Sequence, residues 1–134
     1  MPQSPLLAFF ARLFEPTWLR HQRQAFAAHP PPGWWQVDAT SGALLAGALK
    51  DGLPPQGHML GRGWGWHALG RADGSDDVLY IRRDGRCAIV HLTWQRETDP
   101  RWPVSALYAS LAEARAALYR WSAAPDRPTD PEAP

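Results

Sequence analysis

The strongest constraint on the fold is a β-hairpin signal in the stretch Asp77–Trp94, DVLYIRRDGRCAIVHLTW. Two runs rich in β-branched and aromatic residues flank Asp84-Gly85, a dipeptide that strongly favours a tight hairpin turn. If these two residues form the whole loop, the register of the two strands follows from the loop length. That register pairs Ile81 with Ala88 and Leu79 with Val90.

This register divides the hairpin into two faces of different character. One face is almost wholly apolar and is predicted to be core, with Leu79, Ile81, Ala88, Val90, Leu92 and Trp94. The other face is mixed, with Val78, Tyr80, Arg82, Cys87, Ile89, His91 and Thr93. We expect a helix to cover the mixed face, or the protein to present it to a partner, which could be a second copy in a homodimer.

Helix signals lie on both sides of the hairpin. Ser4 and Pro5 are typical of a helix start, and the apolar stripe between Leu6 and Phe14 predicts a first helix. The run TWLRHQRQAFAAH predicts a second helix, with Leu19, Gln22 or Arg23, and Phe26 on one side. Ser110 and Glu113 form a capping box that opens a C-terminal helix with Leu111, Ala114, Leu118 and Trp121 on one face.

The remaining segments complete an α+β arrangement. GWWQVDA, GRGWGWHALGRA and VSALYA are candidate strands, and SGALLAGALKDG is a candidate short helix that ends at Gly52. We therefore predict an antiparallel sheet of about three to five strands, with N-terminal helices and a C-terminal helix packed on it. Residues 1–121 are expected to form one domain, and residues 122–134 a disordered, proline-rich tail.

Composition restricts the classes of function. The 134 residues carry 14 basic and 13 acidic side chains, so no bulk charge attracts nucleic acid or a membrane, and any binding to such a polymer would have to be local. The N-terminus lacks a basic leading segment and its apolar run is short, so we expect neither a signal peptide nor a membrane span. A soluble cytoplasmic protein is the default.

Catalytic and metal signatures are weak. Cys87 is the single cysteine, and His91 lies four residues along the same strand, about 13 Å away, which is too far for a nucleophile and its base. The five histidines show no metal-ligand spacing, so no metal and no cofactor is expected. A metal-independent, ribonuclease-like hydrolase that uses His67 and His91 stays open. GRGWGWHALG fits no phosphate-loop pattern, and Trp64 and Trp66 are interpreted as core or rim aromatics.

The segment QRETDPRWP after the hairpin changes abruptly to charged, prolyl and aromatic residues. Glu97 and Asp99 could act as an acid and base pair, but Arg and Trp in a proline-rigidified loop are typical of binding interfaces. We therefore predict a partner-binding surface and no catalytic residue. The predicted contact residues are Trp66, His67, His91, Glu97, Asp99, Arg101 and Trp102.

Two stretches together carry a family resemblance. YIRRDGRCAIVHLTW, followed by an acidic residue and then RWPVSALYASLAEA, resembles small bacterial immunity proteins of polymorphic and contact-dependent toxin systems, over roughly Val78 to Leu118. The resemblance implies a cytosolic, non-enzymatic protein that binds the C-terminal domain of a cognate toxin and blocks its active site or substrate access. The resemblance transfers no catalytic residue to this chain. Apart from the resemblance, an adaptor subunit of a secretion apparatus is a further alternative function.

Charge bears on the kind of toxin. Inhibitors of nucleases often mimic an acidic substrate, and the formal net charge of this chain is +1. Either the toxin is not a cationic nuclease, or a local acidic patch such as Asp73, Asp76 and Asp77 makes the contact.

Overall fold

The computed structural model describes Leu6 and residues 15–123. Apart from Leu6, the first predicted helix, between Ser4 and Phe14, lies outside the described residues. The C-terminal helix continues to Ala123, two residues into the tail predicted for residues 122–134, and the rest of that tail also lies outside the described residues.

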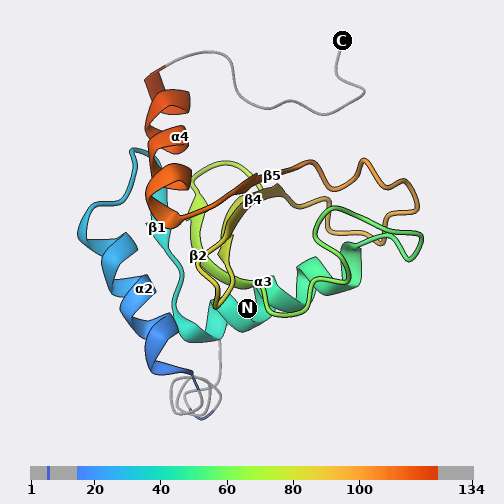
Figure 1. Ribbon diagram of the computed structural model, residues 1–134, viewed down its shortest axis with the longest axis horizontal. Helices are drawn as coiled ribbons and strands as arrows, with labels where there is room; N and C mark the ends of the chain where they lie inside the picture. The colour runs from blue at the N-terminus through green and yellow to red at the C-terminus, as the bar shows by residue number, and fades with distance from the viewer. Residues whose placement is uncertain (1–5, 7–14, 124–134) are drawn as a thin grey trace.

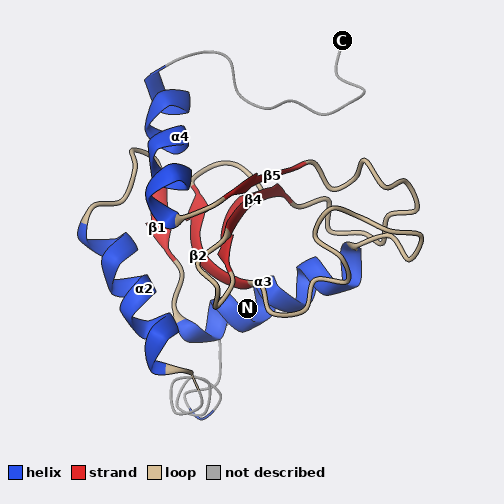
Figure 2. Cartoon of the chain, viewed as in Figure 1, coloured by secondary structure: helices blue, strands red, loops and turns tan. Residues whose placement is uncertain are grey.

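The described chain folds as an α+β protein with a five-stranded antiparallel sheet in the order β1-β2-β3-β4-β5, which confirms the predicted fold class (Figures 1 and 2). Each strand pairs with its neighbours in sequence, so the sheet is a meander. The elements are α2 (Thr17–Ala28), β1 (Trp34–Gln36), α3 (Ala39–Gly52), β2 (His67–Ala72), β3 (Asp77–Ile81), β4 (Cys87–His91), β5 (Ser105–Tyr108) and α4 (Leu111–Ala123).

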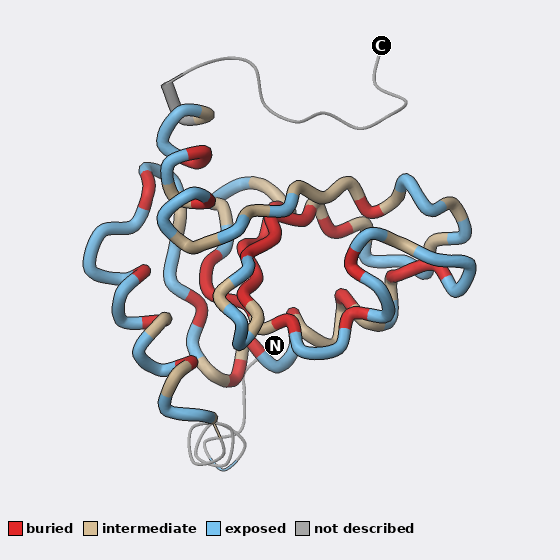
Figure 3. Tube along the Cα trace, viewed as in Figure 1, coloured by how far each residue is buried: buried red, intermediate tan, exposed pale blue. Residues whose placement is uncertain are grey.

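Helices cover both faces of the curved sheet (Figure 2). On one face, Leu45 and Leu49 of α3 pack against inward-facing side chains of β3 and β4. On the other face, Phe26 of α2 and Leu118 of α4 join a second apolar cluster. The buried positions accordingly follow the strands and the inner sides of the helices (Figure 3).

Local signals in the sequence explain where α3 and α4 begin. The Asp38 carboxylate accepts a 2.7 Å hydrogen bond from the Ser41 N–H and so caps α3. The Ser110 hydroxyl accepts from the Glu113 N–H at 3.2 Å, as the capping box predicts. The Glu113 carboxylate returns a bond to the Ala109 N–H at 3.0 Å, one residue before the one that a capping box normally uses.

The hairpin between β3 and β4 forms, but the predicted register is wrong by one residue. The Arg82 N–H donates to the Arg86 carbonyl at 2.9 Å, so the loop contains three residues and not two. Gly85 takes a φ of +92°, the left-handed conformation that three-residue hairpin loops place at this position. The observed pairs are Ile81 with Cys87, Tyr80 with Ala88, Leu79 with Ile89 and Val78 with Val90.

This shift exchanges the two faces of β3 but leaves those of β4 as predicted. Ala88, Val90 and Leu92 are buried core residues, and they pack with Val78 and Tyr80 on the α3 side. The assignment of Leu79 and Ile81 to that face is therefore wrong, because both lie in the cluster under α2 and α4. The face that carries Leu79, Ile81, Cys87 and Ile89 packs against α2 and α4.

Trp94 is a second correction to the predicted core. Strand β4 ends at His91, and Trp94 has a φ of +61°, which turns the chain out of the sheet. Its side chain is 53% exposed.

A buried arginine connects α2 to the rest of the fold. The Arg23 guanidinium donates to the Glu15 carboxylate at 2.6 Å, to the Val37 carbonyl at 2.7 Å and to the Ala68 carbonyl. A Cβ at Gly42 would lie 2.5 Å from the guanidinium, so α3 can approach Arg23 only with glycine at this position. The arginine therefore holds α2, β1, α3 and β2 together.

We predict that Arg23→Met lowers the free energy of unfolding by about 3 to 5 kcal/mol, because the Glu15 carboxylate and two carbonyls would lose their buried partner. Urea denaturation would measure this loss. Arg20→Met, at an exposed position on the same helix, should change stability by less than about 0.5 kcal/mol. Adding Glu15→Gln to Arg23→Met should restore part of the loss, and equal effects of the two arginine substitutions would contradict the role of Arg23.

Candidate functional site

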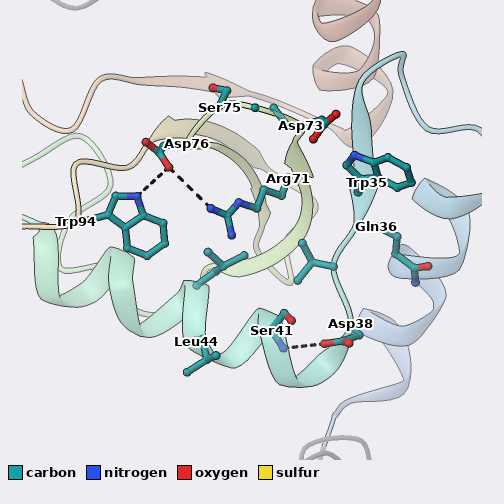
Figure 4. Close-up of a pocket in the computed structure, with 14 residues that line it drawn as sticks. Trp35, Gln36, Asp38, Ser41, Leu44, Arg71, Asp73, Ser75, Asp76 and Trp94 are labelled. Atoms are coloured by element: carbon teal, nitrogen blue, oxygen red, sulfur yellow. Dashed lines mark hydrogen bonds and ion pairs between the residues drawn. The ribbon is translucent and has the colours of Figure 1, made fainter. Parts of the chain in front are cut away.

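A groove of about 980 Å³ lies between the N-terminal half of α3, strand β1 and the turn that joins β2 to β3 (Figure 4). We call it the Trp35–Trp94 groove, after the two indoles that line it. Val37 and Leu45 contribute buried apolar side chains to its lining. The groove is therefore apolar where it meets the core and mixed at its mouth.

Trp94 is held in place although its ring is exposed. The indole Nε1–H donates to Asp76 Oδ1 at 3.0 Å, and the Arg71 guanidinium carbon lies 5.6 Å from the ring centroid. Arg71 also pairs with Asp76 at 3.8 Å, so the three side chains support one another (Figure 4). A left-handed conformation costs a non-glycine residue about 1 to 2 kcal/mol, and here these contacts help to offset that cost.

Two further apolar side chains are exposed at the groove. Trp35 is 64% exposed and Leu44, on the outer side of α3, is 62% exposed. Exposed aromatic and aliphatic groups that gather around a hollow are typical of binding surfaces. Trp35, Leu44 and Trp94 therefore form a candidate contact surface.

The side chains that line the groove carry a net negative charge. Asp38, Asp73 and Asp76 contribute three carboxylates, against the single guanidinium of Arg71. Two members of the expected acidic patch, Asp73 and Asp76, thus lie here. Asp77 does not, because its buried carboxylate faces the opposite side of the sheet and binds His91. A groove with this charge favours a cationic group.

Three of the predicted partner-binding residues, Trp66, His67 and His91, lie in or beside the sheet. Trp66 is 4% exposed and sits in the core beneath the Arg82 guanidinium, so its ring offers no surface to a partner. His67 is half-buried and packs edge-on against the Trp18 ring at 5.4 Å. Burial is the main cause that lowers the pKa of His67, and the nearby Arg23 charge lowers it further.

The other predicted contacts lie in the loop between β4 and β5. Glu97 accepts from the Gln95 side chain at 3.0 Å. Arg101 binds Asp99 at 2.6 Å, which holds the pKa of this carboxyl below its usual range, so Asp99 remains ionised and is a poor general acid. Trp102 is partly buried, and none of these four predicted contact residues lines the groove.

The catalytic histidine pair is not assembled. His67 lies opposite Ile81 at one end of β3, and His91 lies opposite Asp77 at the other end. Four residues of strand, about 13 Å, and the width of β3 separate them. His91 Nδ1 does bind Asp77 at 2.8 Å, but this pair borders a cavity of only about 20 Å³, enough for a water molecule.

Cys87 has the properties of a structural residue. Its side chain is buried, and burial raises the pKa of the thiol to about 12, so it stays protonated at neutral pH. Within the part of the chain that the structure describes, no three His, Cys, Asp or Glu side chains gather in a way that could hold a metal ion.

Sequence reasoning found Asp73 and Asp76 but missed Trp35, Leu44, Arg71 and Trp94. The adjacent pair Trp34-Trp35 was a usable signal, because an alternating strand buries only one of two neighbours. Leu44 could also have been found, since it falls between the inward positions of α3. The exposure of Trp94 had no such signal, since it depends on where β4 ends.

Comparison of the chain with models of known protein families, with curated proteins and with solved structures finds no match. Within residues 15–123, none of the helices combines the length and the apolar character that crossing a lipid bilayer requires.

His58 connects two long loops through hydrogen bonds from both nitrogens of its ring. Its Nδ1 accepts from the Leu60 N–H at 3.1 Å, so its Nε2 carries the proton that is donated to the Pro103 carbonyl at 2.8 Å. Only the neutral imidazole can make both hydrogen bonds, because protonation of Nδ1 removes its lone pair as an acceptor. Burial lowers the pKa of His58 below 6.5, so the unfolded state takes up a proton first as the pH falls.

We predict that the melting temperature falls as the pH drops from about 7.5 to about 5, since stability is lost below the unfolded pKa of a histidine whose folded pKa is lowered. His58→Asn should reduce this slope, whereas His21→Asn, at an exposed position, should leave it unchanged. Thermal unfolding over this pH range would measure both slopes. A slope that persists in full in His58→Asn would contradict the assignment.

Proposed function

We propose that this protein is an immunity protein that neutralises a cognate bacterial toxin domain by binding it through the Trp35–Trp94 groove. The observation that carries the proposal is the exposed Trp94 indole, held by Asp76 and Arg71 at the mouth of an acidic groove. The resemblance of Val78 to Leu118 to immunity proteins supplies the class of partner.

The physical basis of binding is a preorganised aromatic contact. Tryptophan is enriched among the few interface residues that carry most of the binding energy. A ring that is already fixed loses little conformational entropy when a partner covers it. Trp94 meets both conditions, and Trp35 and Leu44 extend the apolar area that a partner would bury.

Charge indicates which part of the toxin domain would enter the groove. A lysine or arginine side chain would gain from the Asp73 and Asp76 carboxylates and from the faces of the indoles. Active sites that handle nucleic acid carry such cationic side chains, so the groove suits a toxin of this kind despite the net charge of +1 on the chain. Neutralisation by occlusion requires no cofactor, and a cytoplasmic location follows from the proposed role.

The two alternatives predict different outcomes. An adaptor subunit would use the same groove but would not protect a cell from a toxin. A hydrolase would depend on His67 or His91, which lie at opposite ends of β3.

We predict that co-expression with the toxin domain encoded by a neighbouring gene restores growth, and that Trp94→Ala weakens binding of the purified domain at least about 30-fold. Leu44→Ala, on the exposed side of α3, should weaken binding without loss of stability. Isothermal titration would measure the affinities, and circular dichroism would verify folding.

Trp64→Ala is the matched control, because Trp64 is also an exposed indole but lies outside the groove. It should retain full protection. If Trp94→Ala and Trp64→Ala protect equally, the groove is not the contact surface. If the wild-type protein protects against none of the toxic domains encoded by neighbouring genes, the proposed immunity function is wrong.

A further inference from the structure

A second pocket, of about 410 Å³, lies at the C-terminal end of α3 and shares no residue with the Trp35–Trp94 groove. Three separate segments meet there: the end of α3 with Lys50 and Asp51, the loop that follows with Arg62 and Trp64, and Arg96 from the loop after β4. Leu53, Pro54 and Pro55 provide its apolar lining. We call it the Trp64 pocket.

Glycines in the segment GRGWG bring Arg62 and Trp64 to the surface. Gly61, Gly63 and Gly65 all have φ values between +65° and +83°, which side-chain-bearing residues rarely adopt. A Cβ on Gly63 would lie 3.0 Å from the Leu53 and Lys50 side chains, so Gly63 packs tightly against them. The residues between the glycines are left facing solvent, and Trp64 is 72% exposed.

The cations of the pocket are not neutralised within the described protein. The Lys50 ammonium lies 4.6 Å from the Trp64 ring centroid and belongs to the last turn of α3, where the helix dipole favours a positive charge. No comparable interaction accounts for the positions of the Arg62 and Arg96 charges. Neither guanidinium has a hydrogen-bond or ion-pair partner among residues 15–123. Asp51 forms no ion pair with them either. Guanidinium groups from separate loops thus line one pocket, in which the three cationic side chains of Lys50, Arg62 and Arg96 outnumber the single carboxylate of Asp51.

We propose that the Trp64 pocket binds a nucleotide, with its phosphate on Arg62 and Arg96 and its base on the open face of Trp64. A guanidinium group can bind phosphate oxygens through two parallel N–H donors, and an indole stacks on any base. The volume lies within the range of small-ligand pockets. A carboxylate of an acidic peptide would use the arginines alone and leave the indole and the proline-lined wall without a role.

This site is independent of the proposed toxin contact, because it uses other residues. The charge balance of the whole chain hides it, since the excess of cations is local. Loss of nucleotide binding should therefore leave protection through Trp94 intact, and loss of protection should leave nucleotide binding intact.

Titration of the full-length protein with AMP tests the proposal. We expect a Kd below about 1 mM that weakens as salt is added. Arg62→Ala, Arg96→Ala and Trp64→Ala should each weaken binding about tenfold. Arg83→Ala, at an exposed arginine in the β3–β4 loop, should leave it unchanged. Thermal unfolding would verify that each variant is folded.

Adenosine and a tetraglutamate peptide complete the experiment. Adenosine should bind more weakly than AMP, because it lacks the phosphate. Absence of AMP binding at about 1 mM, or binding that Arg83→Ala weakens as much as Arg62→Ala, would overturn the proposal. Binding of tetraglutamate in preference to AMP would also overturn it and would assign the pocket to acidic segments of a protein.

Discussion

The buried Arg23 guanidinium is the interaction on which the arrangement of the other elements depends. It brings a charge into the interior, where Glu15 neutralises it and two carbonyls accept hydrogen bonds from its Nη1. Those carbonyls belong to Val37, just before α3, and Ala68, in β2. The position of α3 against the sheet, and with it the shape of the Trp35–Trp94 groove, therefore follows from this network.

The groove exists because α3 and the curved sheet do not close completely at the end where β2 turns into β3. Arg71, Asp76 and Trp94 border this opening and hold one another (Figure 4). Interlocked polar and aromatic side chains keep an exposed ring in one orientation, which is the property that a binding surface needs. The Trp64 pocket at the other end of α3 carries the opposite charge, so the two ends of one helix present chemically distinct surfaces.

Prediction from sequence succeeded where the signal is local. The capping residue Ser110 and the turn residue Gly85 each act within a few positions of chain, so they could be interpreted without knowing the fold. The predicted register of β3 was wrong because hairpin loops of two and of three residues can use the same Asp-Gly signal. A slip of one residue exchanges the two faces of the strand. Of the predicted contact residues, Trp66 proved to be core, and none of the seven lines the groove.

The order of helices and strands, the antiparallel pairing of neighbours and the apolar face of β4 were determined by the amino-acid sequence, because propensity and periodicity act over short distances. Tertiary structure decided that Trp66 is buried and that Trp94 is exposed. Trp66 and Trp94 are the same residue type, yet one lies under Arg82 and the other projects beside Arg71. The difference depends on where strands end and on what packs over them, and those contacts come from residues distant in the chain.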